Sequence, residues 1–255
     1  MGDSEKGSRK AADEFDYEVL VTVLVFLRCL RKELPEFKVT CNAYETSMFN
    51  DVCVIWSGSR CKYALFVQLK HIASKESEPI KKVDLFSSSS NNKSDFNINK
   101  YHDYYKRVEK SLRDTGIQYS LVVSTNVSMH ENAWDYFDER ETDALVGAEL
   151  LHTGGCIFEL DPVEVKNNFD PGFMERFFMF CGQKGVKEIR GEICKELKQL
   201  LGSGAAETNN ACKELCECVK KWKKRLCTNP ENLTCSWSEW KDIENKYKSS
   251  FCTIS

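Results

Sequence analysis

Two polar residues interrupt an apolar stretch of the sequence, YALFVQLKH at 63–71, and their types could do chemistry. Gln68 and Lys70 are two positions apart, so on a β-strand both project from one face, while Val67 and Leu69 project from the other. An amide and an ammonium group therefore share one side of a strand that is otherwise suited to burial.

Asp51 begins the β-rich segment that precedes this stretch. The two segments flank the turn-forming run SGSR at 57–60, a pattern typical of an antiparallel hairpin. With the turn centred on the middle of this run, paired residue numbers sum to about 117, which sets Asp51 opposite Phe66. Gln68 is then one diagonal step away. Glu18, from an earlier helix, is a candidate for the same point.

This group of side chains has the composition of a hard-cation site. Mg²⁺ is usually held by one or two carboxylates together with neutral oxygens, waters and substrate phosphate, and Glu18, Asp51 and Gln68 supply such oxygens. The ammonium of Lys70 can lower the pKa of a nucleophilic water or stabilise negative charge on a reacting phosphate. The chemistry that these types favour is attack of a metal-activated water on a phosphate, and the resemblance described below implies a phosphodiesterase with Mg²⁺ or Mn²⁺ as cofactor.

Each of these residues also has an ordinary structural interpretation. Asp51 suits the start of a strand or a turn, and Gln68 and Lys70 suit the solvent face of an edge strand, where lysine counteracts aggregation. Glu18 lies in the first turn of its predicted helix, where a carboxylate complements the helix macrodipole. Only the combination of the four points to a site.

The elements that must position them alternate between helix and strand. A helix buried along most of its girth is predicted over 16–34, ended by Pro35. Together the elements predict a mixed α and β fold with a central sheet flanked by helices. We predict strands over 51–57, 62–69, 117–123 and 156–160, and further helices over 99–112, 172–181 and 186–201.

The chain has 255 residues, of which 42% are hydrophobic and 29% charged, enough for one main domain and a smaller appendage. The predicted division is a disordered tail over 1–15, the main domain over 16–201, a linker over 202–210 and a helical region rich in Cys and Lys over 211–255. Thirteen cysteines without a secretory signal indicate reduced thiols in the cytoplasm or nucleus.

Charge is unevenly distributed along the chain. Residues 60–113 hold 12 Lys and Arg against 6 Asp and Glu, a balance of +6, whereas residues 131–175 hold 12 acids against 2 bases, a balance of −10. Such an asymmetry is typical either of a basic face that meets polyanions or of two differently charged solvated surfaces. Lys82, Lys100 and Tyr101 lie in the basic stretch and are candidate nucleic-acid-binding residues.

Five short motifs occur in an order that resembles a known nuclease superfamily. They read FDYEVL at 15–20, FNDV at 49–52, VQLKH at 67–71, DFNINKY at 95–101 and STN at 124–126. The series resembles the restriction-endonuclease-like PD-(D/E)xK superfamily in its QxK form. It is also similar to the N-terminal domain of arthropod proteins that carry ankyrin repeats or a nucleotide-binding signalling module, and the similarity extends more weakly over 173–197.

The resemblance implies a role for each candidate residue. Asp51 would be the central metal ligand, Gln68 a second ligand, Glu18 a supporting ligand and Lys70 the catalytic lysine of a nuclease that cuts DNA or RNA. Two departures bear on metal affinity: Asn50 stands where many relatives have Asp, and Gln68 replaces a carboxylate, so the site holds a divalent ion less tightly.

A second reading of the resemblance is a module without catalytic activity. It would bind nucleic acid or a protein partner within a defence or signalling protein. Strand preference, oligomeric state and the choice between DNA and RNA stay open, and a homodimer or a complex with a partner protein is compatible with the sequence.

The C-terminal region adds two weaker motifs. Cys212-x₃-Cys216 lacks the second pair of ligands that a zinc module needs, so ordinary cysteines on an amphipathic helix are favoured. The last four residues, Cys252-Thr-Ile-Ser, fit a prenylation box with farnesyl preference, or a coincidental chain end. Membrane association is expected only if Cys252 is prenylated.

Overall fold

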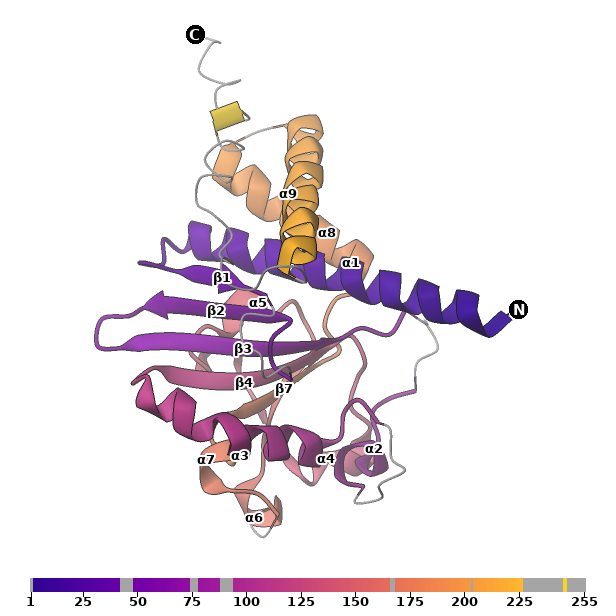
Figure 1. Ribbon diagram of the computed structural model, residues 1–255, viewed down its shortest axis with the longest axis vertical. Coiled ribbons are helices and arrows are strands. Elements are labelled where there is room, and N and C mark those ends of the chain that lie inside the picture. The colour runs from indigo at the N-terminus through magenta and orange to yellow at the C-terminus, as the bar shows by residue number, and fades with distance from the viewer. Residues whose placement is uncertain are drawn as a thin grey trace.

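The chain forms a seven-stranded mixed sheet between two layers of helices, as seen in the computed structural model (Figure 1). The structure describes residues 2–41, 48–73, 78–87, 94–165, 168–202, 204–226 and 245–246. The strand order is β1-β2-β3-β4-β7-β6-β5, with β3, β4 and β7 parallel to one another and the outer pairs antiparallel. The strands are β1 (Lys38–Thr40), β2 (Val52–Ser57), β3 (Lys62–Lys70), β4 (Gln118–Thr125), β5 (Phe137–Arg140), β6 (Cys156–Leu160) and β7 (Phe177–Cys181).

Each face of the sheet has its own hydrophobic core and its own helices. One core joins the sheet to α1 (Gly2–Arg31), α5 (Ala148–Leu151), α8 (Val186–Leu201) and α9 (Ala205–Leu226). The other joins it to α2 (Lys82–Phe86), α3 (Ile98–Asp114), α4 (Glu131–Trp134), α6 (Pro162–Val165) and α7 (Pro171–Met174). A short 3₁₀ turn, Thr142–Ala144, precedes α5. The predicted mixed α and β architecture, with a sheet flanked by helices and a helical C-terminal region, is confirmed.

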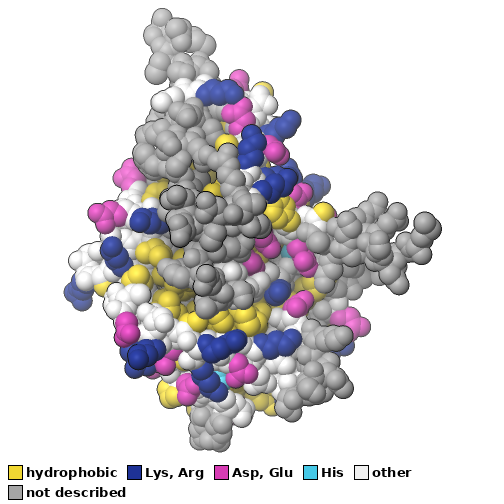
Figure 2. All heavy atoms as spheres, viewed as in Figure 1, with side chains coloured by type: hydrophobic (Ala, Val, Ile, Leu, Met, Phe, Trp, Pro, Cys, Tyr) yellow, Lys and Arg dark blue, Asp and Glu magenta, His cyan; other side chains and the backbone are white. Residues whose placement is uncertain are grey.

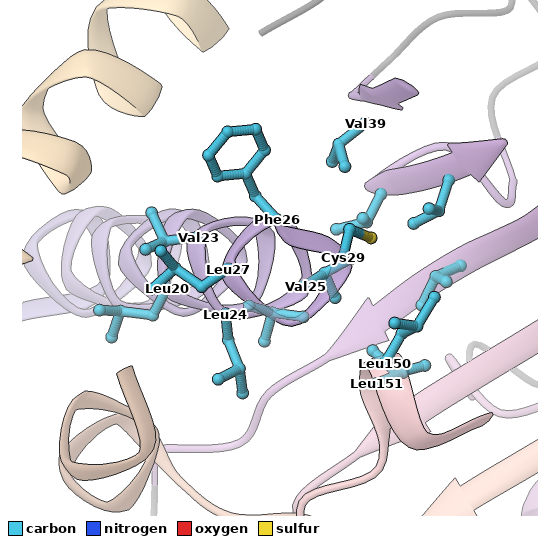
Figure 3. Packing of buried hydrophobic residues seen from close by; sticks show 14 of the residues in the cluster. Leu20, Val23, Leu24, Val25, Phe26, Leu27, Cys29, Val39, Leu150 and Leu151 are labelled. Carbon is cyan, nitrogen blue, oxygen red and sulfur yellow. The ribbon is translucent and has the colours of Figure 1, made fainter. Parts of the chain in front are cut away.

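Helix α1 is buried on almost every side between its Tyr17 and Cys29. Its leucine, valine and phenylalanine side chains project in several directions toward α5, β1 and neighbouring helices (Figure 3). This explains why its sequence lacks a single apolar stripe. The helix begins at Gly2, within the predicted disordered tail, so Glu18 lies in the middle of the helix and not in its first turn.

The β2–β3 hairpin forms as predicted, but the partner of each β2 residue lies two positions further along β3 than expected. Ser57 pairs with Lys62, and the N–H of Gly58 donates to the Cys61 carbonyl oxygen at 2.9 Å across a four-residue loop. The turn is therefore centred one residue later than expected, and paired numbers sum to 119, as in Val52 with Val67. Continuing this register sets Asp51 across from Gln68.

Residues 172–181 do not form the predicted helix. Only Pro171–Met174 is helical, and Phe177–Cys181 is the strand β7, which lies between β4 and β6 with all five residues buried. A central strand covered on both faces is apolar at every position, so it carries no alternation to distinguish it from a buried helix. The short edge strands β1 and β5 were not predicted either.

The C-terminal region folds back onto the main domain. Helix α8 ends at Gly202 in a left-handed conformation (φ 62°), and α9 begins at Ala205, so residues 205–210 of the predicted linker are helical. Helix α9 packs on α1 and α8. Cys212 and Cys216 lie buried in that interface, whereas Cys252 lies outside the described residues. Among the helices that the structure describes, none has the length and apolar character needed to cross a bilayer.

Candidate functional site

Asp51 is fixed at the start of β2 by hydrogen bonds across the hairpin. Its Oδ2 accepts the Leu69 backbone N–H at 2.7 Å and the Gln68 side-chain amide at 2.5 Å. The Asp51 residue is only 9% exposed. A buried carboxylate with two N–H donors is held in one orientation, which is the first requirement for a ligand or a catalytic group.

The electrostatic surroundings favour the protonated form of this carboxyl group. Burial raises the pKa of Asp51 to about 6, and the nearby Glu18 carboxylate adds to that rise. The Leu69 N–H, Lys223 and Lys70 all act in the opposite direction. The pKa of Asp51 is thus close to neutral pH, and any further positive charge brought to the site would increase the ionised fraction of this carboxyl group.

Gln68 and Lys70 lie on the same face of β3, as the strand period requires. This is the face covered by α3, because Ala64 and Phe66, which precede them at the same spacing, belong to the core beneath that helix. Both side chains are half-buried, and Lys70 Nζ lies 3.8 Å from Asp95 Oδ1. The lysine therefore stands at the rim of the site.

Glu18 approaches from α1, but it already has a partner. Its Oε2 accepts a hydrogen bond from Lys223 Nζ at 2.5 Å, and this lysine comes from α9, 205 positions further along the chain. The structure therefore brings Asp51 and Gln68 into direct contact, brings Lys70 and Glu18 within electrostatic range of Asp51, and adds Lys223.

Lys223 was missed because sequence analysis treated the C-terminal region separately. One signal for it exists: Lys223 continues the apolar stripe formed by Cys212, Cys216 and Val219 at helical spacing. A charged residue on the buried stripe of an amphipathic helix needs a partner, and here the partner is Glu18.

The predicted nucleic-acid-binding residues have different surroundings. Lys100 is half-buried and donates to the Ser94 carbonyl oxygen at 2.8 Å. Tyr101 is 1% exposed and its hydroxyl donates to the Asp95 carbonyl oxygen at 2.7 Å, so its ring lies in the core and not in a groove. Lys82 is exposed, 4.3 Å above the centre of the Tyr136 ring.

The end of the parallel strands beside the site is fixed by polar side chains. Asn126, just after β4, both accepts from the Ile72 N–H at 2.9 Å and donates to the Ile72 carbonyl at 2.8 Å. His71, just after Lys70, is 9% exposed and stacks on Tyr17 at 4.4 Å between ring centres. These contacts tie β3 to β4 and to α1, the elements that carry the site.

The donor set fits a divalent ion only if Gln68 contributes. In the described part of the chain, no three His, Cys, Asp or Glu side chains are grouped so as to hold a metal ion. Oxygens that share one Mg²⁺ lie about 3 Å apart, since each Mg–O distance is about 2.1 Å. The Gln68 amide nitrogen is 2.5 Å from Asp51 Oδ2, so turning the amide over would bring its oxygen to a suitable position.

A separate pocket lies at the other end of β3 and β4. Its volume is about 730 Å³, and it is lined by Tyr63, Tyr119, Arg113 and Arg176, among others. The Arg176 guanidinium lies 5.4 Å from the centre of the Tyr119 ring. This pocket is therefore distinct from the Asp51 site.

Neither a protein-family model nor a curated protein matches the sequence. Solved structures of Acinetobacter baumannii Cap4, a SAVED/CARF-domain containing receptor, are similar in fold. The receptor with the cyclic trinucleotide 2′3′3′-cAAA has a TM-score of 0.51 and 8% identity, over 93% of this chain and 45% of the receptor. The receptor with 3′3′3′-cAAA has a TM-score of 0.51 and 8% identity, over 93% of this chain and 48% of the receptor. A further structure of the receptor has a TM-score of 0.50 and 10% identity, over 93% of this chain and 47% of the receptor.

The chain thus spans less than half the length of each receptor chain. At such low identity the comparison bears on architecture and not on individual residues. It shows that this chain shares an α/β fold with part of the receptor.

Proposed function

We propose that the chain is a divalent-metal-dependent phosphodiesterase that cleaves DNA or RNA. The observation that carries the proposal is the contact of the Asp51 carboxylate with the Gln68 amide, 2.5 Å apart, on the sheet face that also carries Lys70. The motif series described above, which resembles the QxK nucleases, supports the same assignment.

In this proposal Asp51 and Gln68 hold the ion and Glu18 supports it. A bound Mg²⁺ supplies Lewis-acid polarisation of a phosphate oxygen and an acidified water as nucleophile. Lys70 stabilises the negative charge that develops on the phosphate, and its position at the rim lets it reach a substrate that lies across the end of β3. Leu69 keeps Asp51 oriented through its backbone N–H.

Positive charge outside the site is available for the nucleic-acid backbone. Helix α3 exposes Lys106, Arg107, Lys110 and Arg113. Figure 2 shows Lys and Arg side chains, with Asp and Glu side chains among them, on the lower part of the face in view. Such a surface binds phosphates without sequence preference and makes affinity depend on salt.

The test is a cleavage assay with plasmid and single-stranded substrates in the presence of Mg²⁺ or Mn²⁺. Asp51→Asn and Lys70→Met should each abolish cleavage. Lys62→Met is the matched control, because Lys62 is an exposed residue at the opposite end of the same strand. Cleavage by both the Asp51→Asn and the Lys70→Met variants would contradict the proposal.

A second candidate function is a module that binds nucleotides or nucleic acid without cleaving them. Two observations favour it. Lys223 already forms an ion pair with the Glu18 carboxylate, and the receptors of similar fold are described in complex with cyclic trinucleotides. The fold comparison supports this candidate more than the first. The pocket near Tyr119 offers an aromatic ring and guanidinium groups for bases and phosphates.

Divalent ions distinguish the two candidates. A metal-dependent enzyme is stabilised by the ion it binds, so its melting temperature rises with Mg²⁺ or Mn²⁺ concentration. A module without a metal site shows no such rise but is stabilised by its nucleotide, for which 3′3′3′-cAAA is the first probe. A Tyr119→Ala variant would report whether the pocket is where that probe binds.

A further inference from the structure

The ammonium group of Lys223 is a buried charge at the edge of the candidate site. Its side chain is 3% exposed, and α9 carries it to Glu18 of α1, with Nζ 2.5 Å from Oε2. An ammonium buried without a partner costs several kcal/mol, so its position is determined by the negative groups around it. In Figure 1 the lower end of α9 rests against α1, which is the contact that delivers the lysine.

The charge of Lys223 extends beyond Glu18. Burial alone would lower its pKa, but Cys41, Glu18 and Asp51 together raise it, so the group stays protonated. Its positive charge also opposes the rise in the pKa of Asp51 and in that of the buried Cys41 thiol. One ammonium therefore acts on both carboxylates that the proposed function assigns to a metal ion.

We propose that Lys223 is a built-in cation of this site: its ammonium pairs with Glu18 close to Asp51 in the ion-free protein and competes with a divalent ion for the site. Helix α9 is then an autoinhibitory element. This inference rests on the proposed function, because it takes Asp51 and Glu18 as the metal-binding carboxylates. A divalent ion and the Lys223 ammonium at the same carboxylates repel each other, so we expect ion binding to displace Lys223.

The position of α9 in the fold suits such a movement. Helix α9 lies outside the sheet and contacts α1 and α8 through side chains. It is joined to α8 through Gly202, whose left-handed backbone (φ 62°) ends the preceding helix. A shift of its C-terminal turn would therefore leave the hydrogen bonds of the sheet intact.

The experiment measures Mn²⁺ binding to the full chain by electron paramagnetic resonance, which counts free Mn²⁺ and needs no catalytic activity. Lys223→Met keeps the aliphatic packing and removes the charge, so Mn²⁺ affinity should rise by about tenfold or more, the factor that corresponds to about 1.4 kcal/mol. Lys223→Arg keeps the charge and should bind as weakly as the wild type.

The matched control is Lys220→Met. Lys220 lies one turn earlier on α9 and pairs with Asp16 at 2.9 Å, away from Asp51. The Lys220→Met substitution removes a positive charge from the same helix and should leave Mn²⁺ affinity unchanged. Circular dichroism of each variant checks that the helical content is kept.

A second measurement uses only the wild-type chain, in case Lys223→Met does not fold. Mn²⁺ binding should speed amide hydrogen exchange in the last turns of α9 and leave α8 unaffected, because the displaced lysine releases that end of the helix. Slower exchange in α9 on Mn²⁺ binding would overturn the inference.

The outcomes separate this inference from the proposed function. Mn²⁺ binding that Asp51→Asn abolishes but Lys223→Met leaves unchanged or weakens overturns the autoinhibitory role, while the metal site stands. Lys223 would then be a positioning residue that holds Glu18. If Mn²⁺ binds to neither the wild type nor Lys223→Met, the metal-dependent function fails, and the competition between Lys223 and an ion fails with it.

Discussion

Asp51→Asn should make the folded protein more stable at neutral pH, although it alters a residue of the candidate site. The wild-type carboxyl group has its pKa raised from 3.8 to about 6 in the folded state. At about 1.4 kcal/mol per pKa unit, ionising Asp51 at pH 7 costs the folded protein about 3 kcal/mol relative to the unfolded chain. Asparagine avoids this cost, because its amide oxygen can still accept the Leu69 N–H.

Because folding raises the pKa of Asp51, the pH range in which this group changes the stability of the protein can be stated. Between about pH 4 and pH 6 the folded state binds the proton of Asp51 and the unfolded state does not, so this group's contribution to the free energy of unfolding falls as pH rises. The stability gained by Asp51→Asn should therefore be largest above about pH 7 and shrink by about 3 kcal/mol toward pH 4. Comparing the variant with the wild type cancels the other titrating groups.

Urea denaturation of both proteins, in chelator to remove divalent ions, measures this difference at each pH. Equal m-values would show that the two proteins expose similar surface on unfolding, so that the difference in midpoint reports stability. A difference that does not vary with pH, or a variant that is less stable than the wild type above pH 7, would refute the assigned electrostatics of Asp51.

Four further substitutions test the fold that carries the site, each by urea denaturation. Gly155→Ala should cost more than about 2 kcal/mol, because Gly155 has φ 67° and an added Cβ would lie 2.1 Å from a backbone oxygen of β7. Gly116→Ala, with φ 66° but open space around it, should cost only about 1 kcal/mol. Arg28→Met should cost about 3–5 kcal/mol, since the buried guanidinium of Arg28 pairs with Glu196 at 3.3 Å and bonds three backbone carbonyl groups. Leu24→Ala, at a fully buried position of α1, should cost about 2–5 kcal/mol, and a loss below 1 kcal/mol would mean that α1 is not packed as described.

Local sequence pattern was sufficient where an element has one polar and one buried side, or clear ends. The hairpin, the helix predicted over 99–112 and the helix over 186–201 all follow from such patterns. The expected partner of Asp51, Phe66, was two residues from the observed one, Gln68, because hairpin register depends on where the turn closes, and the run at 57–60 allowed more than one centre.

The remaining differences come from tertiary structure. The strand Phe177–Cys181 is apolar throughout because it lies in the middle of the sheet, and no local signal reports its neighbours. Lys223 is 205 positions from Glu18, so their contact depends on the docking of α9. The group of residue types could thus be predicted, whereas the helical spacing of Lys223 marks it as buried but does not identify Glu18 as its partner.

The burial of α1 also has a consequence during protein synthesis. Its apolar residues are covered largely by α8 and α9, so the ribosome must add more than half of the chain before this helix finds its partners. At about 5–20 residues per second, the interval from Arg31 to Val186 lasts roughly 8–30 s. During that time a strongly apolar helix is exposed, and we expect nascent chains to bind chaperones through this segment.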